Sequence, residues 1–172
     1  MSKIIINTAR PQFNDTVFIA PNAVVIGDVS LGDDVNIWYG ACVRADVAPI
    51  SIGAGSNIQD NATVHVDVKT PTVIGKRVTI GHNAVVHGAT IGDDVLIGMG
   101  AIILNNALIG NESLVAAGTV VKEGMVIPPG SLVAGIPGKI LKEITPEQQA
   151  HIRENGALYV ECGKAFQLAE KE

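Results

Sequence analysis

An aliphatic residue recurs every six positions through most of this 172-residue chain. Such a period matches neither an α-helix nor alternating strands, and it is typical of a solenoid of short strands joined by tight turns. Three units complete one triangular coil, and each coil stacks on the previous one at a strand spacing of about 4.8 Å. The longest unbroken run is Ile91, Ile97, Ile103, Ile109, Val115, Val121, Ile127 and Val133.

The same phase continues upstream with interruptions. Extra residues follow Val43 and Val64, and one residue is missing after Ile26 and after Val86. A narrow prism filled by Ile, Val and Leu has little room for rings, which agrees with the 3% aromatic content. The upstream inward positions are predicted to be Ile26, Leu31, Ile37, Val43, Ile52, Ile58, Val64, Ile74, Ile80 and Val86.

We expect one domain in three segments. Residues 1–18 form an N-terminal strand and turn, residues 19–140 the β-helix, and residues 141–172 a C-terminal helix packed on it. Thr145 is a suitable N-cap, Pro146 suits the first helical position, and Gly156 is a candidate break that divides the helix into two pieces. The expected apolar stripe consists of Ala150, Ile152, Leu158, Val160, Phe166 and Leu168.

Charge and composition exclude several function classes. A net charge of -5 argues against binding nucleic acid or anionic membranes, since both need a basic face. No apolar run approaches the length of a transmembrane helix, so we expect a cytoplasmic protein. Cys42 and Cys162 stand far apart without CxxC spacing, and we expect reduced packing thiols, with Cys42 a candidate reporter of redox state.

Three of the four histidines fall within 23 residues. His65 follows Val64 and His87 follows Val86, so the two should stack one coil apart on the same edge of the prism. His82 belongs to a different face and should point away from them. One chain therefore does not readily gather all three, whereas a neighbouring subunit of a threefold assembly can supply its own His82.

The same count places Arg44 one coil below His65, and Asp60 one coil below His82.

Three imidazoles without a fourth protein ligand describe an open catalytic metal site, with Zn²⁺ the leading candidate and Fe²⁺ or Co²⁺ also acceptable. The alternative is a set of exposed or interface histidines that bond to the backbone. We expect His151, within the charged helix, to be a surface residue without chemistry.

At these residues the sequence resembles the gamma-class carbonic anhydrases of the hexapeptide-repeat superfamily, which fold as left-handed parallel β-helices and usually form trimers. The H-x4-H spacing of His82 and His87, with His65 seventeen residues earlier, separates this branch from the acyltransferases. The matching segments are VRADV (Arg44, Asp46), NIQD (Asn57, Gln59, Asp60), VHVD (His65), IGHNAVVHG (His82, His87) and ALYV (Tyr159).

The resemblance implies that His65 and His87 of one subunit and His82 of the next hold the metal in a homotrimer. It also implies that Gln59 orients metal-bound water and that Arg44 and Asp46 form an ion pair at the subunit contact, with Asp60 beside them. That pair is equally well interpreted as a pure assembly contact.

The implied reaction is attack of metal-bound hydroxide on carbon dioxide to give bicarbonate. The sequence departs from the family prototype in the acidic residues that export the proton. Val47 stands where one of them is expected, and Asp67 is the only acid in the short insertion after His65. Tyr159 and Glu161 are candidate substitutes if the terminal segment folds over the neighbouring site.

Two other functions stay open. The first is an acyltransferase or thioesterase acting on CoA thioesters, because the fold often uses CoA substrates. The second is a non-enzymatic trimeric scaffold stabilised by a metal, because the usual proton-export residues are missing.

Overall fold

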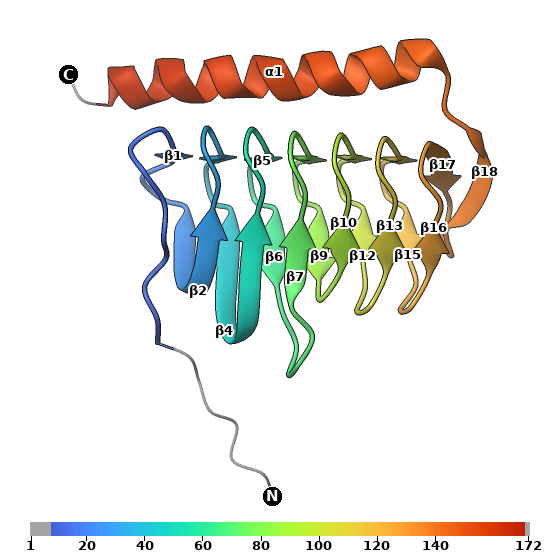
Figure 1. Cartoon of the computed structure of the whole chain (residues 1–172), viewed down its shortest axis with the longest axis horizontal. Helices are drawn as coiled ribbons and strands as arrows, with labels where there is room; N and C mark the ends of the chain where they lie inside the picture. Colours follow the sequence, from blue (N-terminus) through green and yellow to red (C-terminus); the bar gives the residue numbers. More distant parts are fainter. Residues whose placement is uncertain (1–7, 171–172) are drawn as a thin grey trace, which may run out of the picture.

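The computed structural model describes residues 8–170 and folds them as a parallel β-helix flanked by one long helix (Figure 1). This confirms the predicted fold class, a β-solenoid of hexapeptide repeats with a C-terminal helix. Residues 1–7, part of the expected N-terminal strand and turn, lie outside the described residues. Strand β1 covers Phe18–Ile19.

The strands form three ladders, one for each face of the prism, because every third unit pairs in parallel with the unit one coil later. On the face under the helix, Ile80 pairs with Ile97, and Ile97 with Val115. We call this the helix face. After β1 it contains β3 (Asn36–Ile37), β5 (Asn57–Ile58), β8 (Thr79–Ile80), β11 (Leu96–Ile97), β14 (Leu114–Val115) and β17 (Ser131–Ala134).

The other two faces share two long strands, β2 (Val24–Leu31) and β4 (Cys42–Ile52), which continue from one face to the next. The second face contains their first halves and then β6 (Thr63–His65), β9 (Val85–His87), β12 (Ile102–Ile103) and β15 (Val120–Val121). The third face contains their last halves and then β7 (Thr72–Ile74), β10 (Thr90–Ile91), β13 (Leu108–Ile109) and β16 (Val126–Ile127).

One inward position differs from the prediction. Val25, not Ile26, pairs with Val43, and Ile26 is 52% exposed. Counting from Val25 to Leu31 restores the six-residue interval, so no residue is missing at this point. Val25 and Ile26 are both aliphatic, so the sequence pattern fits either of them at the inward position. Strand pairing decides that Val25 takes it.

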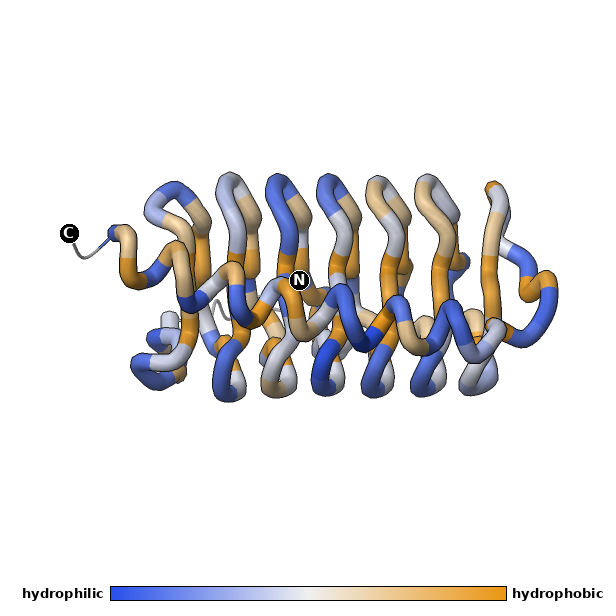
Figure 2. Tube along the Cα trace, turned by 90° about the horizontal axis from the view of Figure 1, so that it is seen from above, coloured by the Kyte–Doolittle hydropathy of each residue, from blue (hydrophilic) through white to orange (hydrophobic). Residues whose placement is uncertain are grey.

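The core is a column of aliphatic side chains along the axis of the prism. Ile37, Ile58, Ile80 and Ile97 are fully buried in successive coils of the helix face. Figure 2 shows hydrophobic segments recurring at equivalent places in successive coils. Because each layer contacts only the layers next to it, the fold is held together by many similar nearest-neighbour contacts.

The helix α1 (Pro146–Ala169) runs back along the prism toward the first coils (Figure 1). Before it, β18 (Lys139–Glu143) pairs antiparallel with β17. The predicted cap is confirmed: the Thr145 side chain accepts a hydrogen bond from the Gln148 backbone, and the Gln148 side chain accepts one from the Thr145 backbone. No helix within residues 8–170 is long and apolar enough to cross a membrane.

Two expectations for this helix are wrong. Gly156 does not break it, because Gly156 is buried against Arg77, and the close packing outweighs the low helix propensity of glycine. Leu158 and Leu168 do not face the prism, since they are 59% and 68% exposed. Ile152 of the predicted stripe is buried, together with Gly156 and Gly163, and a Cβ at Gly163 would lie 3.0 Å from the Asn36 side chain.

Aromatic residues join the end of α1 to the first coils. Trp38 makes edge-on contacts with Phe18, Tyr159 and Phe166, at ring-centroid distances of 5.3, 5.5 and 5.2 Å. The rings of Phe18, Trp38, Tyr159 and Phe166 thus lie outside the prism, between its helix face and the helix. This contact fixes the position of Tyr159 over the coils that carry the histidines.

The stacking of the coils leaves no room for a side chain at Gly53. A Cβ at Gly53 would lie 2.6 Å from the Gly75 backbone in the next coil, whereas a Cβ at Gly124 would meet nothing within 4 Å. We expect Gly53→Ala to destabilise the protein by about 3 kcal/mol or to prevent folding. Gly124→Ala should cost only about 1 kcal/mol, for its positive φ. Urea unfolding at one protein concentration measures both, and equal losses would contradict the argument.

Candidate metal centre

Two histidines stack at one edge of the prism. His65 and His87 are register partners on β6 and β9, each directly after an inward valine, as the six-residue phase predicts. His65 Nδ1 lies 2.9 Å from His87 Nε2, and the ring centroids are 4.9 Å apart. Both rings are half-buried. The stacking follows from backbone pairing alone and requires no ligand.

Asp46 determines which nitrogen of His65 is free. Asp46 Oδ1 lies 3.0 Å from His65 Nε2, and its other oxygen pairs with Arg44. Partial burial opposes ionisation of Asp46, but the hydrogen bond to His65 and the charge of Arg44 prevail and lower its pKa. An ionised carboxylate only accepts, so His65 carries its proton on Nε2 and leaves the lone pair of Nδ1 facing His87.

His87 has an oxygen partner of its own. His87 Nδ1 lies 2.6 Å from Asn105 Oδ1, and the amide nitrogen of Asn105 donates to Asp67 at 3.0 Å. With a proton on Nδ1, the lone pair of His87 Nε2 faces the lone pair of His65 Nδ1. Two lone pairs at this distance repel unless a proton or a metal cation lies between them.

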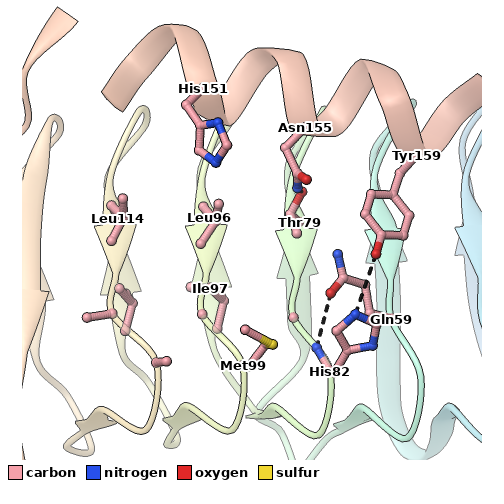
Figure 3. Close-up of a pocket in the computed structure, with 15 residues that line it drawn as sticks. Gln59, Thr79, His82, Leu96, Ile97, Met99, Leu114, His151, Asn155 and Tyr159 are labelled. Carbon is pink, nitrogen blue, oxygen red and sulfur yellow. Dashed lines mark hydrogen bonds between the residues drawn. The ribbon is translucent and has the colours of Figure 1, made fainter. Parts of the chain in front are cut away.

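His82 lies at a different corner, in the turn after β8. Its Nδ1 is 2.9 Å from Asp60 Oδ2, and its Nε2 is 3.5 Å from the Tyr159 hydroxyl (Figure 3). Its backbone N–H donates to Gln59 Oε1 at 3.1 Å. Asp60 therefore joins His82, one coil away as the phase count indicates, while Arg44 and Asp46 join His65.

Gln59 is buried beside His82 and held from both ends. Its amide nitrogen donates to Asn57 Oδ1 at 3.2 Å, and Asn57 in turn donates to Thr79 Oγ1 at 2.9 Å. Asn155 of α1 donates to the same Thr79 oxygen at 3.1 Å. The helix is thus connected to Gln59 through Thr79 and Asn57; Figure 3 shows Asn155 above Thr79.

A cavity of about 370 Å³ opens between α1 and the helix face. Gln59, His82 and Tyr159 line one end, His151 lies at the other, and apolar side chains such as Leu96 and Met99 form the wall (Figure 3). His151 is exposed, but it lines this cavity and is not on a remote surface.

Within one chain, the three histidines meet some of the requirements of a metal site. Two zinc–nitrogen bonds at a tetrahedral angle place the ligating atoms about 3.3 Å apart, close to the separation of His65 Nδ1 and His87 Nε2. Each of the three histidines has one nitrogen against an oxygen atom, as metal-ligating histidines do. However, no three His, Cys, Asp or Glu side chains among residues 8–170 form a complete site.

The remaining candidates lie outside this arrangement. Glu161 is exposed and pairs with Lys164, at 3.3 Å. Cys42 and Cys162 are free and partly buried. Sequence reasoning missed Asn105. The same phase count, extended by one coil from Gly88, would have placed Asn105 next to that glycine and so near His87.

Comparison with known proteins gives a consistent family. A family model described as "Bacterial transferase hexapeptide (six repeats)" matches residues 88–123. A Methanocaldococcus jannaschii protein named "Probable carbonic anhydrase" is 51% identical over 156 residues, covering 91% of this chain and 98% of that protein. The Arabidopsis thaliana protein "Gamma carbonic anhydrase 2, mitochondrial" is 42% identical over 94% of this chain, which spans 63% of that protein's length.

A solved structure carries a different functional name. It is a Bacillus cereus protein assigned provisionally as an acetyltransferase, with a TM-score of 0.91 and 36% identity. The alignment covers 93% of each chain. The fold of this chain is therefore shared with proteins named for two kinds of chemistry.

Tyr159, which lies beside His82, should lose its proton at a higher pH than a free tyrosine. Burial raises the pKa of Tyr159, and Asp60 and Cys162 raise it further. Tyr39 has a raised pKa from desolvation and its hydrogen bond to Glu170. The chain has two tyrosines, and the absorbance transitions of both tyrosinates should have their midpoints above pH 10.0. Tyr159→Phe and Tyr39→Phe assign the two transitions, and a tyrosine ionising near neutral pH would contradict this assignment.

Proposed function

The chain belongs to the gamma-class carbonic anhydrase family of hexapeptide-repeat proteins, and from this we propose that it catalyses the reversible hydration of carbon dioxide to bicarbonate. The proposed site lies between subunits of a homotrimer, with His65 and His87 from one subunit and His82 from the next. One observation carries the proposal: ring nitrogens of His65 and His87 face each other at 2.9 Å, while Asp46 and Asn105 hold the opposite nitrogens.

Zn²⁺ is the first metal to test, with Fe²⁺ and Co²⁺ as the alternatives, since three imidazoles accept each of them. If these three imidazoles held Zn²⁺, the metal would lower the pKa of a bound water to about 7 and so supply a nucleophile at neutral pH.

Two carboxylates orient the rings of His65 and His82. Asp46 keeps the proton of His65 on Nε2, and Asp60 keeps the proton of His82 on Nδ1, so both rings present an unprotonated nitrogen. Arg44, whose side chain is 47% exposed, neutralises Asp46 and has donors left for a subunit contact. We assign Arg44 to assembly.

Gln59 is proposed to orient the substrates. One N–H of its amide group donates to Asn57, which leaves the second N–H for an oxygen atom in the cavity beside His82. Because Gln59 is buried and held at both ends, its donor is already oriented before substrate arrives. Tyr159, with its raised pKa, acts as a neutral hydroxyl group next to His82 and not as a base.

The two acidic candidates for proton export, Asp67 and Glu161, both have other partners. Asp67 has both carboxylate oxygens engaged, one with the Val68 backbone and one with Asn105. Glu161 pairs with Lys164. We therefore propose that the proton leaves to external buffer and that turnover is modest at low buffer concentration.

A second function is favoured by the acetyltransferase assignment of the Bacillus cereus protein and by the apolar wall of the cavity. In this alternative the cavity takes the acyl part of a CoA thioester. Binding and turnover of acetyl-CoA test it. The cytoplasmic location predicted from the sequence stays a prediction.

The deciding experiment is stopped-flow hydration of carbon dioxide. Protein loaded with Zn²⁺, and separately with Fe²⁺ under argon, is compared with His82→Ala prepared in the same way. We expect His82→Ala to lose roughly 100-fold or more of the activity, because it removes one of three metal ligands. Inactive wild type with metal bound would overturn the proposal and favour thioesters or a metal-stabilised scaffold.

Mixing inactive variants tests whether subunits share the site. His82→Ala and His87→Ala subunits are unfolded together, mixed equally and refolded into trimers. If each site combines two subunits, random assembly restores about a quarter of the sites. Each variant refolded alone is the control. Activity that does not recover in a mixed trimer would mean that each site belongs to a single chain.

A further inference from the structure

Asn105 lies at the edge of the prism one coil beyond His87, and it connects three separate segments. Its Oδ1 faces His87 Nδ1 at 2.6 Å, and its Nδ2 donates to Asp67 Oδ2 at 3.0 Å. Asp67 belongs to the insertion after β6, so residues distant in sequence meet at this amide. Neither Asn105 nor Asp67 is among the three proposed ligands.

Asp67 decides which way the amide of Asn105 points. A carboxylate only accepts hydrogen bonds, so the NH₂ group must face Asp67. The carbonyl oxygen then faces His87, and that oxygen needs a proton on Nδ1. A reversed amide would place the carbonyl oxygen against the carboxylate and an N–H against a ring nitrogen that must then be unprotonated. The charge of Asp67 thus selects the tautomer of His87.

Local backbone structure holds Asp67 and Asn105 in this position. Asp67 Oδ1 accepts from the Val68 backbone at 2.7 Å, and Asp67 and Thr70 exchange backbone hydrogen bonds at 3.2 and 2.9 Å. Gly88 leaves the space that the amide occupies, because a Cβ there would lie 2.6 Å from Asn105 Oδ1. Gly88 has a φ of +59°, which also favours glycine.

We propose that Asn105 and Asp67 are positioning residues for the metal: together they hold His87 in the Nδ1–H tautomer, with the lone pair of Nε2 directed at the place where a cation binds. This inference rests on the proposed function, since it assumes that His87 is a ligand. It differs from the role of Asp46 on His65, because a neutral amide is the direct partner and the charged group stands one residue further away.

The test measures zinc affinity by competition with a chromophoric chelator, using full-length trimers of each variant. Asn105→Leu removes the acceptor for His87 and should weaken zinc binding roughly 10- to 100-fold. The exchanged pair, Asp67→Asn with Asn105→Asp, restores both hydrogen bonds with the amide and carboxylate reversed, and it should bind zinc within a few-fold of wild type. Asn111→Leu is the matched control, because Asn111 Oδ1 accepts from the Asp93 backbone N–H instead of a histidine.

A second readout separates positioning from a structural role. Nitrogen-15 spectra of the histidine rings in metal-free protein report which nitrogen carries the proton. We expect the Nδ1–H form of His87 in wild type and in the exchanged pair, and a mixture of tautomers or the Nε2–H form in Asn105→Leu. Loss of stability alone would not move this signal.

The outcomes are distinct. Folded trimers of Asn105→Leu that bind zinc as tightly as wild type would overturn the inference and leave the proposed function intact. So would an exchanged pair that assembles normally but stays as weak as Asn105→Leu. Wild type that takes up no Zn²⁺, Fe²⁺ or Co²⁺ would overturn the proposed function, and this inference with it.

Discussion

Parallel pairing between coils is the constraint on which the rest of the structure depends. Each strand of two or three residues finds its hydrogen-bond partners one coil away, as Ile80 does with Ile97, so equivalent residues stack in columns. The columns fill the core with aliphatic side chains and, at one edge, place His65 directly beside His87. A single repeated interaction therefore builds the scaffold and one half of the candidate metal centre.

The irregular units lie at the edge that carries the site. Regular hexapeptides follow one another from Ile91 to Val133, whereas the extra residues after Val43 and Val64 both leave the prism between the second and third faces. The first insertion brings Asp46 to His65, and the second brings Asp67 to Asn105. The insertions therefore supply two carboxylates at this edge: Asp46 acts directly on His65, and Asp67 acts on His87 through Asn105.

The parts that sequence reasoning predicted well are those that follow from counting. The stacking of His65 on His87 and of Asp60 next to His82 both come from phase, because one coil is a fixed number of units. Prediction failed where packing competes with a local rule. Gly156 stays helical because it is buried against Arg77, and Val25 replaces Ile26 because strand register selects it.

By itself, the sequence determined the coil, the columns and the identity of the side chains that share an edge, since a period of six allows one way of stacking. It also placed His82 on a different face from His65 and His87. Only the tertiary structure decided that the insertion after β6 brings Asp67 to Asn105, and that α1 brings Tyr159 to His82. The six-residue period does not relate the segments that these contacts join. The free nitrogen of each histidine ring depends on how the neighbouring side-chain dipoles and charges are oriented.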